Sequence, residues 1–153
     1  MSTEEFEAAL SESPFFRGME QRQTHELAMQ AAEESFRAGE FIFHEGEDAQ
    51  KFYIIQAGKV TLEVLVPDRG ITVVQTISAG DVLGWSWLFP PHRWHFDSRA
   101  VEATRTLSID ADWLRQRIEG DHDFGYEMMK RIARVMVTRL QATRLQVTDV
   151  YRT

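Results

Sequence analysis

The segment from Gly39 to Ile109 alternates apolar and polar side chains with a period of two and is interrupted by glycines at short intervals. A period of two is the repeat of a β-strand, because successive side chains of a strand point to opposite faces. Glycine accepts the positive φ of a tight turn without a Cβ clash, so we expect turns at Gly46 and Gly58. Many short strands joined in this way favour an antiparallel barrel or double-sheet jelly roll. We expect the strands at residues 41–43, 52–56, 59–66, 71–77, 99–103 and 105–110.

Helical patterns flank this segment on both sides. Apolar residues recur at helical spacing in residues 3–12 and 20–34, and Pro14 separates the two stretches. After the last strand, aspartates that can cap free helix amides precede a helix starting at Trp113 and a longer one over 123–147. The expected fold is therefore mainly β with flanking α: an antiparallel jelly-roll barrel with N-terminal helices and a long C-terminal helix. We expect one domain over 1–153, with N-terminal helices in 1–35, the barrel in 36–110 and C-terminal helices in 111–153.

Composition narrows the function. The chain has 153 residues and no cysteine, which excludes a disulfide framework, a thiol nucleophile and cysteine metal ligands. Its net charge of -7 argues against generic nucleic-acid binding, which depends on Lys and Arg neutralising phosphates. The N-terminus lacks an export signal and no apolar run is long enough to cross a bilayer, so we expect a cytoplasmic protein with no membrane partner.

Three ordered segments carry a resemblance to a known family. They are the turn segment 36–49, the pair 53–55 and 58–60, and the stretch Ile77-Ser78-Ala79-Gly80-Asp81-Val82-Leu83-Gly84. Together with the flanking helices, residues 14–147 resemble the cyclic-nucleotide-binding domain of bacterial catabolite activator proteins, kinase regulatory subunits and gated channels. The resemblance implies a regulatory role in signal transduction and a binding site for cAMP or cGMP.

Residues 83–103 correspond to the phosphate cassette of that family. The resemblance implies a glycine that lets the backbone approach the cyclic phosphate, a glutamate after it for the ribose, and an arginine for the phosphate. Gly84 fits the glycine, but Trp85 stands in place of the glutamate, and the arginine-bearing strand aligns best with 97–101. The candidate ligand-pocket residues are Leu83, Gly84, Trp85, Ser86, Asp97, Ser98 and Arg99.

In this alignment Asp97 replaces the phosphate arginine. Two unit charges about 4 Å apart interact by about 4 kcal/mol at an effective dielectric near 20, so reversing the sign disfavours an anionic ligand. We therefore expect no cofactor, with cAMP and cGMP possible but disfavoured. An alternative remains open, because Arg99 faces the same side of the strand as Asp97 and would hold the phosphate if the alignment slipped by two residues.

The cassette is also rich in aromatic residues: Trp85, Trp87, Phe89, Trp94 and Phe96. They either fill the end of the barrel as core, or form a pocket for a planar or cationic ligand whose charge Asp97 balances. His92, His95 and His44 raise a different alternative, a small metal-dependent cupin-like enzyme. The cupin spacing of histidines and glutamate is absent, so we expect no metal site and no catalytic residues.

The last predicted helix carries an apolar stripe of Met129, Ile132, Met136 and Leu140. This stripe either packs on the barrel or forms a homodimer, as the equivalent helix of the resembling family does. The chain ends at Thr153, which leaves no room for a helix-turn-helix, so we expect no DNA partner. The sequence thus predicts a non-catalytic ligand-sensing or protein-interaction module, with an unidentified protein as a further possible partner.

Overall fold

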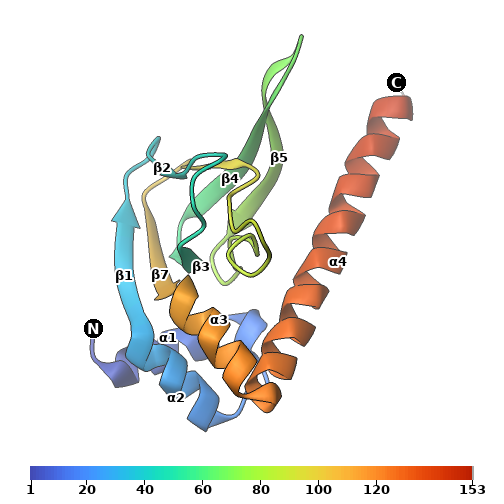
Figure 1. The fold of residues 1–153 in the computed structure, drawn as a ribbon. Helices are drawn as coiled ribbons and strands as arrows, with labels where there is room; N and C mark the ends of the chain where they lie inside the picture. The colour runs from blue at the N-terminus through green and yellow to red at the C-terminus, as the bar shows by residue number, and fades with distance from the viewer. Residues whose placement is uncertain (153) are drawn as a thin grey trace.

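Two antiparallel sheets face each other around an apolar core in the computed structural model, which describes residues 1–152 and the side chains of residues 1–144 (Figure 1). One sheet has the order β1-β7-β3, from Ala31–Phe36, Thr104–Asp110 and Lys51–Ala57. The other has the order β2-β6-β4-β5, from Phe41–Phe43, Asp97–Ala100, Lys59–Val66 and Gly70–Ser78. Every paired strand is antiparallel. The predicted jelly-roll arrangement is confirmed.

The core fills the space between the sheets. Phe52 and Ile54 of β3 lie opposite Ile109 and Leu107 of β7, and all four side chains are essentially inaccessible to solvent. Burial of such side chains stabilises the fold by about 1.5–3 kcal/mol each relative to leaving them exposed. Burial does not simply alternate along these strands, because four consecutive residues of β3, 52–55, are buried and belong to the core.

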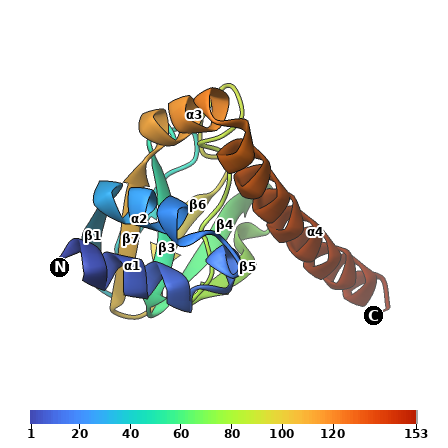
Figure 2. The same ribbon diagram turned by 90° about the horizontal axis from the view of Figure 1, so that it is seen from below.

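The N-terminal segments close one end of the barrel. They comprise α1 (Thr3–Glu12), the 3-10 turn η1 (Pro14–Phe16) and α2 (Gln21–Gln30), and Figure 2 shows α1 and α2 lying across this end. Leu10, Phe16 and Leu27 join the core from these elements. The helix predicted over 20–34 is too long, because residues 31–34 belong to β1. The alanines and glutamates there favour a helix locally, but pairing with β7 overrides that preference.

Two other boundaries differ from the prediction. The strand expected at 99–103 is β6, Asp97–Ala100, and residues 101–103 connect it to β7. After β7, helix α3 (Ala111–Gly120) begins two residues before the predicted Trp113, and the Asp110 carboxylate caps it by accepting from the Trp113 amide. The long helix α4 spans His122–Arg152. Among the described residues, no helix is long and apolar enough to cross a membrane.

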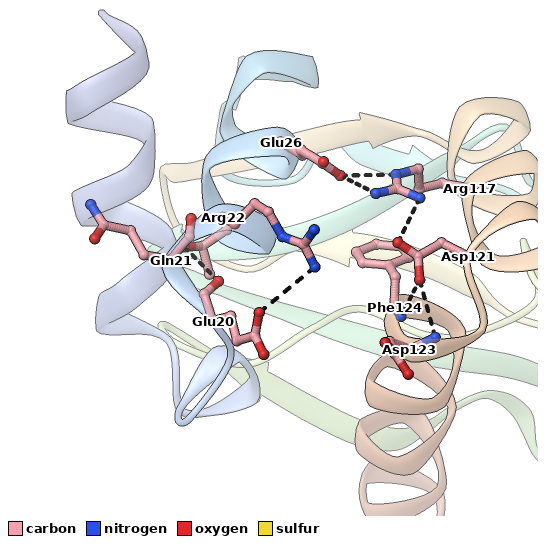
Figure 3. Close-up of polar contacts among 9 residues, drawn as sticks. Glu20, Gln21, Arg22, Glu26, Arg117, Asp121, Asp123 and Phe124 are labelled. Carbon is pink, nitrogen blue, oxygen red and sulfur yellow. Dashed lines mark hydrogen bonds and ion pairs between the residues drawn. The ribbon is translucent and has the colours of Figure 1, made fainter.

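A cluster of charged residues fixes where α4 leaves the body of the protein (Figure 3). Arg117 of α3 pairs with Glu26 of α2 at 2.7 Å and with Asp121 at 3.0 Å. The Asp121 carboxylate accepts hydrogen bonds from the Phe124 and Asp123 amides at the start of α4, and the Phe124 contact is the main cause that lowers its pKa. From this junction α4 runs past β5 and away from the barrel in both views (Figures 1 and 2).

Candidate functional site

The cassette residues that follow β5 form a compact loop. Leu83 is buried and donates its amide to the Tyr53 carbonyl, and Gly84 has a φ of 128°, a backbone conformation that favours glycine. The indole nitrogen of Trp87 donates to the Gly84 carbonyl at 3.2 Å, and the Trp87 ring packs 5.0 Å from that of Phe52. Trp85 and Ser86 are half-buried. The first four candidate pocket residues are thus neighbours in space.

The ring of Trp94 covers Gly84. A Cβ built on this glycine would lie 3.3 Å from the Trp94 ring. The Trp94 indole therefore occupies the space beside the Gly84 backbone that the absence of a side chain leaves open. Trp94 is only 5% exposed and stacks on Phe43, with centroids 3.8 Å apart and planes 4° from parallel. We call the place where residues 84–96 meet the turn 44–49 the cassette mouth. Of the two alternatives for the aromatic residues, Trp87 and Trp94 follow the first, because both belong to the core.

Backbone hydrogen bonds hold Trp94 in this place. The Trp94 carbonyl accepts from the Gly46 amide at 2.8 Å, and the Trp94 amide donates to the Glu47 carbonyl at 2.9 Å. A third bond runs from the Ala49 amide to the His92 carbonyl at 2.7 Å. The cassette loop is therefore joined to the turn between β2 and β3, and the cassette mouth is closed by the protein's own main chain and indole.

Strand β6 divides the remaining candidates between its two faces. Ser98 lies opposite Leu62 of β4, and directly opposed residues of an antiparallel pair share a face, so Ser98 faces the core. The Ser98 hydroxyl is buried without a hydrogen-bond partner among the described residues. Asp97 and Arg99 alternate with Ser98 and lie together on the outer face, half-buried. They do not share a face with Ser98, so the seven candidates do not converge on one point.

Asp97 serves the turn between β2 and β3. Its carboxylate accepts from the Glu45 amide at 2.8 Å and lies 3.5 Å from Nδ1 of His44. Within residues 1–144, no group of three His, Cys, Asp or Glu side chains gathers closely enough to hold a metal ion. The roles proposed for Asp97, either repelling a phosphate or balancing a cation, stay predictions.

Arg99 is held by a buried carboxylate. Its guanidinium pairs at 2.7 Å with Glu63, which is 2% exposed and also accepts from the Thr61 hydroxyl at 2.8 Å. The guanidinium carbon lies 5.8 Å from the centre of the Phe41 ring. The arginine proposed as the alternative phosphate ligand therefore already has a partner of opposite charge.

The predicted apolar stripe of α4 is split between two faces of the helix. Ile132 is 1% exposed and belongs to the core, and Met136 packs against that core. Met129 and Leu140 are 40% and 70% exposed. The stripe therefore divides between the two alternatives: Ile132 and Met136 pack on the barrel, whereas Met129 and Leu140 are left exposed, and the homodimer stays a prediction.

The family model for the cyclic nucleotide-binding domain matches residues 33–121, more than half of the chain. The chain belongs to the cyclic nucleotide-binding domain family. This domain is 28% identical over 141 residues to a CRP-like cAMP-activated global transcriptional regulator of Mycobacterium tuberculosis. The match covers 92% of the chain but 61% of that relative, so the chain spans less than two thirds of it.

Solved structures of cyclic nucleotide-binding proteins have a similar fold. A putative cyclic nucleotide-binding protein of Geobacter metallireducens superposes with a TM-score of 0.78 at 25% identity, covering 92% of this chain and 98% of that one. The regulatory subunit of a cAMP-independent protein kinase A from Trypanosoma cruzi, bound to guanosine, superposes with a TM-score of 0.65 at 25% identity, covering 81% and 48%. The resemblance predicted from the glycine turns and the segment ending at Gly84 is confirmed at the level of the family.

Proposed function

We propose that this cyclic nucleotide-binding domain is a non-catalytic sensing or interaction module whose cassette binds neither cAMP nor cGMP. The observation that carries the proposal is the Trp94 ring over Gly84. A phosphate that approached the Gly84 backbone would have to displace an indole that is 5% exposed and stacked on Phe43. Removing a buried Trp side chain from a core typically costs about 3–5 kcal/mol, and displacing this one would forfeit much of the same packing.

The charges around the cassette support the same conclusion. For Arg99 to bind a phosphate it would have to leave Glu63, whose carboxylate would stay buried without its cation. The Arg99 side chain is 39% exposed, so solvent screening keeps this cost below the about 3–5 kcal/mol of a fully buried pair. Asp97 lies on the same face as Arg99 and adds a negative charge there. The Trypanosoma cruzi structure is the regulatory subunit of a cAMP-independent protein kinase A bound to guanosine, which supports a role for this fold that does not depend on cAMP.

A fluorescence titration tests this function. The four tryptophans report on the cassette, since three of them lie within it. We expect no saturable change on adding cAMP or cGMP to the unmodified protein. A saturable change at sub-micromolar cAMP that Arg99→Ala abolishes would instead establish the nucleotide-sensing alternative. The expectations that the protein binds no DNA and is not an enzyme stay predictions.

We also propose that the domain forms a homodimer through the outer face of α4. Five residues on this face follow a spacing of three and four and are all exposed: Tyr126, Met129, Ala133, Val137 and Leu140. Such spacing gives a continuous seam on a helix, and large apolar side chains gathered on one seam favour burial against a partner. This outer seam replaces the predicted one, because Ile132 and Met136 are used by the barrel.

A further inference from the structure

A cavity of about 430 Å³ lies between α4 and β5, on the side of the barrel where α4 leaves the body of the protein. Its volume falls in the range of small-molecule sites, roughly 300–1,000 Å³. We call it the helix cavity. None of Gly84, Asp97 and Arg99 lines it, so nothing below depends on whether the cassette mouth is closed.

The helix cavity is positively charged in a protein of net charge -7. Arg131, Arg134 and Arg139 line it from α4, and Asp81 is the one acidic residue among its lining residues. Glu127, next to the cavity, pairs with Arg131. Three cations against these two carboxylates leave the local charge positive. An anion bound here would therefore gain attraction that the rest of the acidic surface does not offer.

Two of these arginines have buried guanidinium nitrogens that lack a partner in the described part of the chain. Arg131 is 5% exposed and its Nε is unpaired, although its other nitrogens bond Glu127 and the Arg17 carbonyl. Arg139 donates to the Val82 carbonyl, and its Nη1 is unpaired. Buried donors are almost always satisfied in native proteins, and an unpaired one in a charged group is costly.

The surroundings of Arg139 explain why it is kept there. Its guanidinium carbon lies 5.6 Å from the centre of the Trp85 ring, and its backbone carbonyl accepts from the Gln75 side chain at 3.2 Å. Burial lowers the pKa of Arg139 to about 10, so the side chain still carries its charge at neutral pH. A cation held between a strand and a helix in this way is positioned to receive an anion.

The rest of the lining is apolar. Phe15, Ile77, Val82, Val135 and Ala142 form this part, and the hydroxyls of Thr76 and Thr138 lie among the lining residues. An inorganic ion alone would leave these apolar side chains without a contact. A ligand that matches both parts has a negatively charged oxygen head and an apolar body.

We propose that the helix cavity binds a small organic anion with an apolar body, through the guanidinium groups of Arg131, Arg134 and Arg139. The anionic head, a carboxylate or a phosphate monoester, pairs with the exposed guanidinium of Arg134 and is attracted by the charges of Arg131 and Arg139 beside it. The apolar body lies against Phe15, Val82 and Val135. Because the lining comes from both β5 and α4, an occupied cavity ties the helix to the barrel.

Calorimetric titration with four probes tests this proposal. Octanoate and octyl phosphate carry both a charged head and an apolar body, whereas octanol lacks the charge and inorganic phosphate lacks the apolar body. We expect octanoate and octyl phosphate to bind at least about tenfold more tightly than octanol and inorganic phosphate. A tenfold change in Kd is about what one charge-assisted hydrogen bond contributes. Whichever of the first two binds more tightly identifies the head group.

Three variants locate the site. Arg134→Gln removes an exposed cation from a helix surface, so it preserves the fold, and we expect it to weaken octanoate about tenfold. Ala142→Phe fills the cavity without changing its charge and should abolish binding. Arg105→Gln, an exposed arginine on β7, is the matched control and should leave affinity unchanged. The proposal would be overturned if all three variants bound octanoate with equal affinity. It would also be overturned if octanol bound as tightly as octanoate, or if neither anion bound at millimolar concentration.

Discussion

Replacing Trp94 by alanine should both destabilise the protein and open the cassette mouth. The ring is 5% exposed, stacks on Phe43 at 3.8 Å and touches the Cβ position of Gly84 at 3.3 Å. Truncation of a buried Trp costs about 3–5 kcal/mol, and the stacked pair accounts for about 0.5–1.5 kcal/mol of this. We expect the free energy of unfolding to fall by that total in urea denaturation.

Added indole should restore part of the lost stability. An apolar cavity left by a deleted side chain stays dry and binds small aromatic molecules. At an indole concentration one hundred times its dissociation constant, the gain is about 2.7 kcal/mol. Trp85→Ala is the control, because its half-buried ring should give a smaller loss and no rescue by indole. A loss below about 1 kcal/mol for Trp94→Ala, or no effect of indole on it, would refute the reasoning that this ring fills the mouth.

Three further predictions concern stability and association. Gly58→Ala should lower the free energy of unfolding by much more than Gly46→Ala. Both positions have a positive φ, which costs an alanine about 1–2 kcal/mol. Only at Gly58 would the added Cβ also lie 2.6 Å from a backbone oxygen. Equal losses in thermal unfolding would contradict this. Leu140→Asp should yield a folded monomer in sedimentation, because Leu140 is exposed on the outer seam. Ile132→Asp should instead unfold the chain, because it buries an unpaired carboxylate. A Leu140→Asp variant that still dimerises would rule out the outer seam as the interface. Burial, then the charge of two nearby glutamates, raises the pKa of Tyr53 above its usual value near 10. The stability that this tyrosine contributes is therefore present below pH about 10 and is lost as the pH rises further. As the pH rises from about 9 to about 11, the free energy of unfolding should fall less for Tyr53→Phe than for the unmodified protein. Parallel pH profiles for the two proteins would show that Tyr53 is not the group responsible for the loss.

Much of the fold could be predicted from the sequence because its determinants are local. The strand at 59–66 and the first helix at 3–12 were predicted with the bounds that the structure has, because their apolar residues recur with the periods of a strand and of a helix. Strand β1 could not be predicted, because its alanines and glutamates become a strand only by pairing with β7. The sequence left open whether the apolar residues of α4 pack on the barrel or on a second copy, because an apolar residue on a helix does not tell which of two neighbours it contacts.

The candidate site was harder to predict than the fold. Gly84 and the aromatic cluster could be found from sequence, but which ring covers the glycine depends on hydrogen bonds between residues 92–94 and 46–49 that close only in the folded loop. Asp97 and Arg99 were correctly placed on one side of a strand, since they are two residues apart. Their actual partners, the Glu45 amide and the Glu63 carboxylate, come from other strands and turns that no local pattern identifies.

The state of Trp94 in the presence of nucleotide tests the closed cassette mouth most directly. The four tryptophans give four indole N–H signals in a nitrogen–proton correlation spectrum, and Trp94→Phe assigns the one that matters. We predict that this signal keeps its position when cAMP or cGMP is added at millimolar concentration, because the ring stays stacked on Phe43 over Gly84. A saturable displacement of the Trp94 signal, or its replacement by a new one as cAMP is added, would show that the indole yields to the nucleotide and would contradict the account.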